Sequence, residues 1–361
     1  MKRKRKLTAT MAAVVVTGAA IAGGVAGITT SMASAAAKPA VTAAQGGTWS
    51  AAITVPGVAF ISDLTCTSPG NCVAVGGADI IAERDGVWRA PQAVPGLDAL
   101  RKSMHSTISG VNVVSCSSAG NCAVAGAVGG RDASGTPHVW VATQANGAWG
   151  KAHLVAGTAG GAISALSCPK DGDCTAVGSI VPGKGKAIIE APLVVSENGG
   201  TWGKPQVIAT GSLLAYPSFR LTAVSCTRSG DCSATGEVDN DASDASFTSR
   251  RAALVTETNG TWGAPSLVPA LPAPANSGDP QIADNTASGI WCQAPGDCTV
   301  AGDYALASTT KVTTAGAFIA TQVNGAWRPA ILLRGTGSGY SSVAASCGKA
   351  GDCASDNSLP S

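Results

Sequence analysis

Short runs in which apolar and polar residues alternate follow one another along most of this chain, and a period of two is typical of half-buried β-strands. One such run, residues 253–257 (ALVTE), leads into Asn259-Gly260, a pair that favours a type I′ hairpin turn because both positions tolerate a positive φ. Equivalent pairs stand at Asn146-Gly147, Asn324-Gly325, Asp85-Gly86 and Gly46-Gly47. The pattern predicts an all-β chain of short antiparallel strands joined by tight hairpins.

Two phrases recur along the chain: a cysteine hairpin of the form C-x3-G-[DN]-C and a turn that ends in tryptophan, close to N-G-x-W. The cysteine pairs are Cys66/Cys72, Cys116/Cys122, Cys168/Cys174, Cys226/Cys232, Cys292/Cys298 and Cys347/Cys353, which account for all 12 cysteines. The tryptophans are Trp49, Trp88, Trp149, Trp202, Trp262 and Trp327. A repeat of roughly 50 to 65 residues that contains several short strands is typical of the blades of a β-propeller.

Each full repeat predicts four strands. One strand runs into the first cysteine, as at 221–226, and a second leaves the other cysteine and ends on a glycine. These glycines are Gly76, Gly126, Gly178, Gly236 and Gly302. A third, alternating strand turns at the Asn-Gly pair into a fourth that begins near the tryptophan. We therefore expect blades that are four-stranded antiparallel meanders.

The two ends of the chain each carry half a repeat. Cys347 and Cys353 are followed by no tryptophan phrase, whereas residues 41–49 (VTAAQGGTW) match residues 141–149 (VATQANGAW) but follow no cysteine pair. Joining the halves predicts a six-bladed β-propeller, closed by two carboxy-terminal and two amino-terminal strands, with no exposed sheet edge. The alternative is an open solenoid with irregular caps. The expected glycine after Cys353 is absent, so we expect the final strand to be short.

The amino terminus predicts a secretory signal peptide over residues 1–35, followed by a propeller domain over residues 36–361. A cluster of five basic residues at positions 2–6 precedes an apolar stretch from position 7 to about 26, and Ala33-Ser34-Ala35 is a small-x-small cleavage signal. We place the cleavage between Ala33 and Lys38. An uncleaved membrane anchor is the alternative, because the apolar stretch is long for a signal core.

Export changes the charge of the chain. The whole sequence has 24 Lys and Arg and 22 Asp and Glu; five of the basic residues lie in the leader, so 19 remain against 22, a net charge of about −3. This balance disfavours nucleic acid as a partner. We found no second apolar stretch long enough to span a membrane. We therefore expect a compact, secreted, extracellular monomer.

In an exported chain, an even number of cysteines in local pairs predicts disulfides within each hairpin. Each turn contains a glycine followed by Asn or Asp, residues that tolerate left-handed backbone conformations. Each small loop would contribute roughly 2 kcal/mol to stability. Zinc is the alternative, but its ligands are usually closer in sequence, and His105, His138 and His153 do not recur with the repeat. We predict no metal site and no cofactor.

The meander places the cysteine turns and the Asn-Gly turns at one end of every blade. The opposite end carries the connections that follow the glycine and the tryptophan, and their lengths vary strongly from repeat to repeat. In repeat proteins, variation confined to one face usually marks the binding face.

Residues 196–202 (SENGGTW), with the similar phrases that end in Trp262 and Trp327, resemble the Asp-box (BNR) repeat of sialidases and related propellers. The phrase is one residue shorter than that repeat and mostly has Asn where the repeat has Asp. The whole mature chain is also similar to secreted bacterial propeller repeat proteins with an S-C-x3-G-x-C phrase. In Asp-box families the motif is a structural turn remote from catalysis, so the resemblance implies a fold more than an activity.

A sialidase-like reaction would need an arginine cluster and a tyrosine nucleophile paired with an acid, as the resemblance implies. The candidates on the variable connections are Tyr216, Tyr304 and Tyr340, the arginines Arg101, Arg131, Arg220, Arg250, Arg251 and Arg334, and the acids Glu190 and Glu237. None of these residues has a diagnostic spacing. We therefore predict a binding or scaffold module for carbohydrate or a cell-surface protein, with a glycoside hydrolase or lyase as the alternative. The ligand-binding candidates are Arg131, Tyr216, Arg220, Tyr304 and Tyr340.

Two further features are open to two interpretations. The polar insertion from Asp239 to Asp244 has several carboxylates that could bind Ca²⁺, but it lacks the glycine and distal glutamate of an EF-hand, so a solvated acidic loop is the simpler interpretation. Trp140 and Trp291 lie outside the repeated phrase and could stack on a sugar. Their positions beside a strand and a cysteine favour the core.

Overall fold

The structure is a computed structural model. It describes residues 57–106, 109–129, 136–182, 190–213, 216–239, 250–271, 282–308, 311–334, 343–349 and 352–357. The proposed signal segment 1–35 and the strand expected at 41–49 lie outside these residues. No helix in the described part of the chain is long and apolar enough to cross a membrane.

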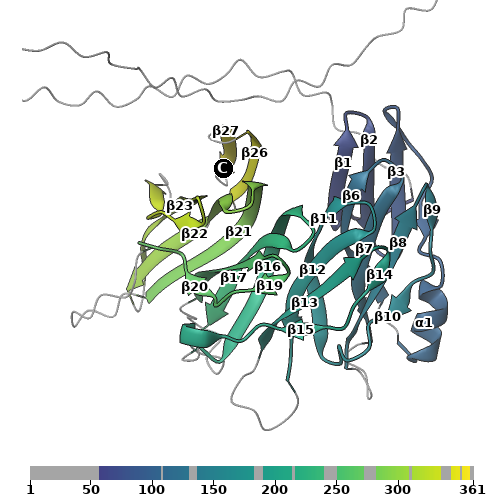
Figure 1. Cartoon of the computed structure of the whole chain (residues 1–361), viewed down its shortest axis with the longest axis horizontal. Helices are drawn as coiled ribbons and strands as arrows, with labels where there is room; N and C mark the ends of the chain where they lie inside the picture. Colours follow the sequence, from purple (N-terminus) through teal and green to yellow (C-terminus); the bar gives the residue numbers. More distant parts are fainter. Residues whose placement is uncertain are drawn as a thin grey trace, which may run out of the picture.

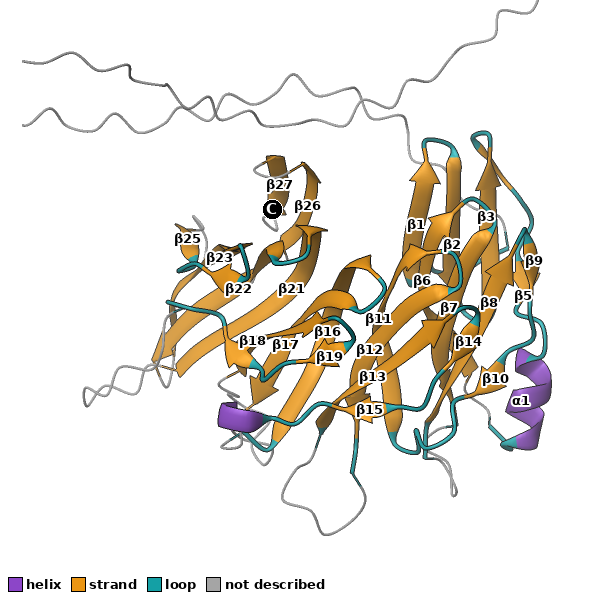
Figure 2. Cartoon of the chain, viewed as in Figure 1, coloured by secondary structure: helices purple, strands orange, loops and turns teal. Residues whose placement is uncertain are grey.

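Five antiparallel sheets follow one another along the described chain, in agreement with the all-β prediction (Figures 1 and 2). Sheet 1 contains β1 (Asp63–Ser68), β2 (Asn71–Gly76), β3 (Asp79–Arg84), β4 (Val87–Trp88) and β5 (Gln92–Ala93). Sheet 2 contains β6 (Ser109–Ser118), β7 (Asn121–Val128), β8 (His138–Ala145), β9 (Ala148–Trp149) and β10 (His153–Leu154). Helix α1 (Leu97–Ser103) lies between them in sequence.

The next three sheets repeat the same order. Sheet 3 contains β11 (Gly161–Lys170), β12 (Asp173–Ile180), β13 (Ala191–Asn198), β14 (Thr201–Trp202) and β15 (Gln206–Val207), and the short 3₁₀ helix η1 (Gly211–Leu213) follows it. Sheet 4 contains β16 (Ser218–Arg228), β17 (Asp231–Asp239), β18 (Arg250–Thr258), β19 (Thr261–Trp262) and β20 (Ser266–Leu267). Sheet 5 contains β21 (Ile282–Ala294), β22 (Asp297–Ser308), β23 (Lys311–Val323), β24 (Ala326–Trp327) and β25 (Ile331–Arg334).

Each sheet is four-stranded, as predicted, but its outer strand is broken into two short pieces. In sheet 3, β14 pairs with one end of β13 through Glu197 and Trp202, and β15 pairs with the same edge through Leu193 and Val207. Residues 203–205 (GKP) separate the two pieces. Proline cannot donate to the ladder, so an interruption at the edge strand is where the sheet tolerates it best.

The prediction that the second strand ends on its glycine is correct only for β2. The equivalent strands β7, β12, β17 and β22 continue past the glycine. The inner strand opposite bulges at this point, for example between Leu221 and Ala223 in β16. A Cβ at Gly236 would lie 2.0 Å from the carbonyl oxygen of Arg220. A Cβ at each of the equivalent glycines would lie 1.9 to 2.0 Å from the backbone carbonyl oxygen opposite it. The glycine is therefore required by the bulge and does not end the strand.

Successive sheets pack face to face in chain order. Strand β6 packs against β1 and β2, β11 against β6 and β7, β16 against β11 and β12, and β21 against β16 and β17. A hydrophobic cluster fills each interface: Val75 meets Val124 between sheets 1 and 2, and Val177 meets Phe219 between sheets 3 and 4. The predicted core position of Trp140 is confirmed, because its side chain is fully buried. The arrangement is that of consecutive propeller blades.

The described residues form five such sheets, not the predicted six, and no sheet is closed by strands from both ends of the chain. The hairpin of β26 (Val343–Lys349) and β27 (Asp352–Asn357) is a separate two-stranded sheet. Strand β26 contacts β21 and β22, and no comparable packing joins it to β1 among the described residues. The strands that would complete the hairpin into a sixth blade were expected at 41–49, outside the described ranges.

The two kinds of turn lie together at one end of each sheet, as predicted. In all five sheets, the glycine carbonyl of the cysteine turn accepts a hydrogen bond from the second residue of the hairpin turn, at 2.8 to 2.9 Å. The glycine has a positive φ, for example +84° at Gly120. We expected the Asn or Asp after this glycine to have a positive φ as well, but it does not. Its side chain instead accepts a backbone N–H from the hairpin turn, as Asn121 does from Asn146 at 2.9 Å.

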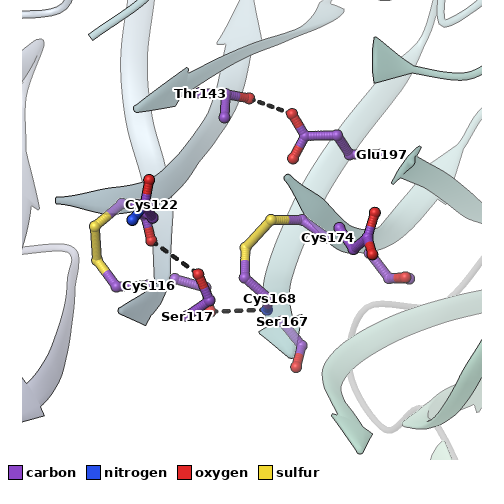
Figure 3. The surroundings of a disulfide bond; sticks show 12 residues. Cys116, Ser117, Cys122, Thr143, Ser167, Cys168, Cys174 and Glu197 are labelled. Atoms are coloured by element: carbon purple, nitrogen blue, oxygen red, sulfur yellow. Dashed lines mark hydrogen bonds between the residues drawn. A yellow bond between two sulfur atoms is a disulfide. The ribbon is translucent and has the colours of Figure 1, made fainter. Parts of the chain in front are cut away.

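Five of the six predicted disulfides are present, each joining two cysteines directly opposite each other in a hairpin. They are Cys66–Cys72, Cys116–Cys122, Cys168–Cys174, Cys226–Cys232 and Cys292–Cys298. The backbone register also places Cys347 opposite Cys353, whose side chains lie outside the described part. Figure 3 shows the disulfides of sheets 2 and 3.

The serine of the S-C phrase joins neighbouring sheets. Its hydroxyl oxygen accepts a hydrogen bond from the backbone N–H of the first cysteine in the next sheet. The bonds run from Cys168 to Ser115, from Cys226 to Ser167 and from Cys292 to Ser225, at 2.9 to 3.0 Å. The phrase therefore encodes both a disulfide within one sheet and a link between two.

Candidate functional site on the loop face

The end of the sheets opposite the disulfides carries the connections of variable length, and it is called the loop face below. Five charged side chains from three successive sheets meet there. They are Glu190, which precedes β13; Arg220 and Glu237 on β16 and β17; Arg250 on β18; and Asp284 on β21. This set is called the loop-face cluster.

Arg220 lies between two carboxylates from different sheets. Its Nε is 3.0 Å from Glu237 Oε1 and 3.6 Å from Glu190 Oε2. Arg220 and Glu237 are direct partners in the ladder of β16 and β17, which explains their contact. Glu190 also accepts hydrogen bonds from Ser218 at 3.0 Å and from Ser179 at 3.2 Å. The Glu190 carboxylate is therefore fixed by groups of its own sheet and of the next.

Arg250 extends the cluster to sheet 5. It makes a bidentate ion pair with Asp284, with Nε donating to Oδ1 at 3.0 Å and Nη2 to Oδ2 at 2.7 Å. Its Nη1 lies 3.7 Å from Glu237 Oε2. A planar guanidinium fork fits a carboxylate in this geometry and resists rotation. The two arginine side chains are 41% and 36% exposed, whereas that of Glu237 is only 10% exposed.

Burial raises the pKa of Glu237, and the charges of Arg220 and Arg250 oppose that rise. The carboxylates of Asp284 and Asp239 act in the same direction as burial. Glu237 is thus a carboxyl on which burial and the neighbouring arginine charges act in opposite directions. A buried acid beside two cations can take up or release a proton when a bound ligand changes its burial or the positions of the nearby charges.

Three of the five predicted ligand residues are described by the structure, and of these three Arg220 lies in this cluster. Tyr304 is 4% exposed and packs in the core between sheets 4 and 5, in the same cluster as Phe318. Tyr216 is partly buried against the core between sheets 3 and 4. Arg131 and Tyr340 lie outside the described residues. A sialidase-like arrangement would need a tyrosine beside an acid, and neither described tyrosine is held at this cluster.

Sequence reasoning named Glu190, Glu237 and Arg250 but could not group them, and it missed Asp284 and the serines entirely. The missing information was the register. Arg220 opposes Glu237 only after the bulge in β16 has shifted the pairing of β16 with β17. Asp239 opposes Arg250 in the ladder of β17 with β18. The acidic insertion after Asp239 lies outside the described residues. Within the described ranges, no group of three His, Cys, Asp or Glu side chains could hold a metal ion.

No protein-family model and no curated protein matches the chain. Similar solved structures include YCF48 bound to D1 peptide, with a TM-score of 0.42 and 13% identity over 84% of this chain and 77% of that one. An α-L-arabinanase of Penicillium chrysogenum complexed with arabinobiose has a TM-score of 0.37 and 12% identity over 71% of this chain and 76% of that one. An H18N11 subtype N11 neuraminidase-like protein has a TM-score of 0.35 and 7% identity over 72% of this chain and 70% of that one.

These structures are β-propeller proteins. With TM-scores this low, the similarity carries no argument about ligand or reaction. The five repeated sheets, packed face to face in chain order, identify the architecture more directly. The chain has β-propeller architecture. The function of this propeller must be argued from its own side chains.

Proposed function

We propose that this protein is a secreted extracellular binding module whose loop face recognises a carbohydrate at a cell surface. The observation that carries the proposal is the loop-face cluster, in which two arginines hold three carboxylates from successive sheets. The ion pairs fix donors and acceptors close together, while Arg220 and Arg250 stay more than one-third exposed. A rigid polar surface of this kind limits the entropy lost on binding.

The chemistry of the cluster suits hydroxyl groups. A sugar hydroxyl both donates and accepts a hydrogen bond, so it can bind a carboxylate and a guanidinium that lie side by side. A simple anion would meet three carboxylates, and a simple cation would meet two guanidinium groups. The cluster therefore favours a neutral, polyhydroxylated ligand over either ion.

Export is supported by the disulfides, which form and persist in oxidising compartments. The basic and apolar leader at 1–35 supports the same conclusion, and its removal would leave the soluble, monomeric domain predicted above. We place the ligand outside the cell for these reasons.

We further propose that residues 41–49 pair with the hairpin β26–β27 to form a sixth blade and close the ring. The support comes from sheet 1. Val114, two residues before Cys116, packs against sheet 1 and is 3% exposed. Leu64 is in the equivalent position before Cys66, where no preceding sheet is described, and it is 52% exposed. A blade in this place would bury that side chain, together with its exposed neighbours Phe60 and Ile61.

Closure is tested by deleting residues 36–49 from the mature protein. Hydrogen exchange should then become faster in β26–β27 and in β1, while sheet 3 keeps its protection, because the ends of the ring lose their common partner. Unchanged exchange at both ends would refute the closed ring without affecting the binding proposal.

The binding proposal is tested by a screen of glycans and cell-wall polymers on the mature protein. Arg220→Met keeps the length of the side chain but removes its charge and donors, and it should weaken binding at least tenfold. Arg228→Met is the matched control, because Arg228 also pairs with a carboxylate, that of Asp231, but at the disulfide end. Equal losses in the two variants, or no bound glycan, would contradict the proposal.

A glycoside hydrolase is the second candidate, favoured by one observation. Glu190 and Glu237 both lie beside Arg220, and burial raises the pKa of Glu237. Glycoside hydrolases use two carboxyl groups, of which the general acid has a raised pKa. Fluorogenic glycosides incubated beside the screen decide between the candidates. Turnover that disappears in Glu237→Gln would replace the binding module with an enzyme.

A further inference from the structure

A second polar site lies at the disulfide end of the molecule, in a cleft of about 530 Å³ between sheets 4 and 5. Asp231, Thr256 and Glu257 line it from sheet 4, and Gln322 and Trp327 line it from sheet 5. The cleft is separate from the loop-face cluster, because the disulfide Cys292–Cys298 and the hairpin turns form its walls. Binding in this cleft is therefore independent of the function proposed for the loop face.

Gln322 presents an acceptor that no protein group satisfies. Its side chain is 5% exposed, and its Nε2 donates to the carbonyl oxygen of Gly325 at 3.1 Å. This bond fixes the orientation of the amide, and Oε1 is left buried without a partner. A buried acceptor without a donor destabilises the fold, because it has lost its hydrogen bonds to water. A ligand that brings a donor would recover this energy.

Gln144 in sheet 2 also has a buried, unpartnered side-chain oxygen, but there is no room for a ligand beside it. Nε2 of Gln144 donates to Gly147 at 3.1 Å, and its Oε1 is also unpartnered. The cleft that Gln144 lines between sheets 1 and 2 has a volume of only about 30 Å³. The two glutamines therefore share their chemistry and differ in the space beside them.

The charge of the larger cleft has one sign. Asp231 and Glu257 are its titratable lining residues, and no Lys, Arg or His contributes to its lining in the described chain. Asp231 is paired with Arg228 outside the cleft. Along β18, Ala253 and Val255 pack toward sheet 3, whereas Ala252 and Leu254 pack toward sheet 5, so the side chain of Thr256 faces the cleft and that of Glu257 faces sheet 3. Trp327, half-buried, adds an aromatic surface. The Asp231 carboxylate and the indole ring of Trp327 attract a cation, the first through its charge and the second through the face of the ring.

We propose that this cleft binds a cationic group with several N–H donors, a primary ammonium or guanidinium carried on a short apolar chain. The donors satisfy Gln322 Oε1 and the Asp231 carboxylate, and the apolar chain lies against Trp327. Such a group occurs on small amines and on the basic side chains of peptides. Both sources bring the same chemistry to the site.

The test is a titration of the mature protein with agmatine and with n-butylammonium, followed by calorimetry and by the indole N–H signals in NMR spectra. Trp327→Phe identifies the signal of that ring. Both cations should bind saturably and shift the Trp327 signal, whereas 1-butanol and methyl glucoside should not. Absence of saturable cation binding, or equal binding of the neutral compounds, would overturn the proposal.

Three variants at equivalent positions assign the site. Gln322→Leu removes the acceptor and should weaken cation binding roughly tenfold. Gln144→Leu makes the same change where the cleft, of about 30 Å³, is too small for a ligand, and it should leave binding unchanged. Gln322→Glu places an acid where the equivalent positions have Glu197 and Glu257, so it should fold, and in its ionised form it should bind the cations more tightly. Equal effects of Gln322→Leu and Gln144→Leu, or weaker binding by Gln322→Glu, would refute the assignment.

Discussion

The interface between sheets 2 and 3 and the interface between sheets 3 and 4 use equivalent residues, yet their outer ends differ. In the first, the Thr143 hydroxyl donates to Glu197 Oε1 at 2.6 Å and accepts from Trp202 Nε1 at 3.0 Å (Figure 3 shows the bond to Glu197). In the second, Glu257 Oε2 and Trp262 Nε1 are buried without partners. The second interface also contains a cleft of about 260 Å³.

A single methyl group distinguishes the two interfaces at the decisive position. Ser196 in sheet 3 is equivalent to Thr143 in sheet 2, because both precede the buried Glu or Gln opposite the tryptophan. The branched side chain of threonine restricts χ1 and so fixes the direction of its hydroxyl, whereas serine rotates more freely. The comparison teaches that the repeated phrases encode the sheets and their turns, while a residue outside the phrases decides how two sheets meet.

The two glutamates differ electrostatically for the same reason. Burial raises the pKa of Glu197, and the hydrogen bond from Thr143 opposes that rise. Burial, with a smaller contribution from Asp231, raises the pKa of Glu257 to about 7. Across the interface, Asp173, Glu197 and Lys204 line the same cleft as Glu257. One repeat position thus holds an acid with a partner in sheet 3 and an acid without one in sheet 4.

The largest effect is expected from removing the hydroxyl of Thr143. Thr143→Val keeps the shape of the side chain but leaves Glu197 and Trp202 without a shared partner, which should lower the free energy of unfolding by about 3 kcal/mol. Denaturant titration measures the loss. Ser196→Ala is the matched control and should change stability by less than about 0.5 kcal/mol, since Ser196 satisfies neither group of its neighbour. Similar losses in both variants would remove the contrast between the interfaces.

A smaller, pH-dependent effect is expected at Glu257. Because folding raises its pKa from 4.5 to about 7, the protonated form stabilises the fold below pH 4.5, and this contribution is lost as the pH rises to 7. Glu257→Gln should therefore stabilise the protein by about 2 kcal/mol at pH 8 and have almost no effect at pH 4.5. Thermal unfolding at the two pH values measures the difference. A stabilisation that is independent of pH would contradict the buried, unpartnered acid.

Converting the interface between sheets 3 and 4 into one like that between sheets 2 and 3 should raise the free energy of unfolding by about 1 kcal/mol. Ser196→Thr supplies the methyl group that fixes the hydroxyl, so a bond to Glu257 or Trp262 can form. We expect greater stability and a lower pKa of Glu257, measured by NMR titration of its carboxyl carbon. Increased stability with an unchanged pKa would assign the effect to packing instead.

The smallest difference is expected at the inner end, where the two interfaces are alike. Ser115 and Ser167 accept the same hydrogen bond from the cysteine of the next sheet, both at 3.0 Å. Ser115→Ala and Ser167→Ala should each lower stability by about 1 kcal/mol, and by equal amounts. A marked inequality in denaturant titrations would show that the interfaces differ along their whole length.

The fold could be predicted in detail because its signals are local. Positive φ at Asn146 and Gly147, the facing cysteines and the alternating strands all follow from residues a few positions apart. The bulge of the inner strand could not be predicted, although its trace is present: Gly236 stands where a Cβ would meet the carbonyl oxygen of Arg220. Reading that glycine as a strand end instead of a bulge partner gave the wrong boundary.

The candidate site was predicted only in part, because charged residues distant in sequence carry no local pattern. Arg250 and Asp284 meet only after two sheets have packed together. Tyr304 fits a loop position by its spacing, but its ring fills the core between sheets 4 and 5. Sequence spacing locates the end of a strand, and packing decides which way its side chains face.

The serine links give the sheets a direction. Each sheet from 2 to 4 offers a hydroxyl to its successor, and each cysteine that receives one belongs to the following sheet. Subunits joined by unlike ends either complete a circle or polymerise without limit. The chain has Ser346 before Cys347 at one extremity and the N–H of Cys66 at the other, so these two ends are complementary. If the ring closes as proposed, chains that lack residues 36–49 would leave these matching ends free, and such chains would join one to the next into a fibre.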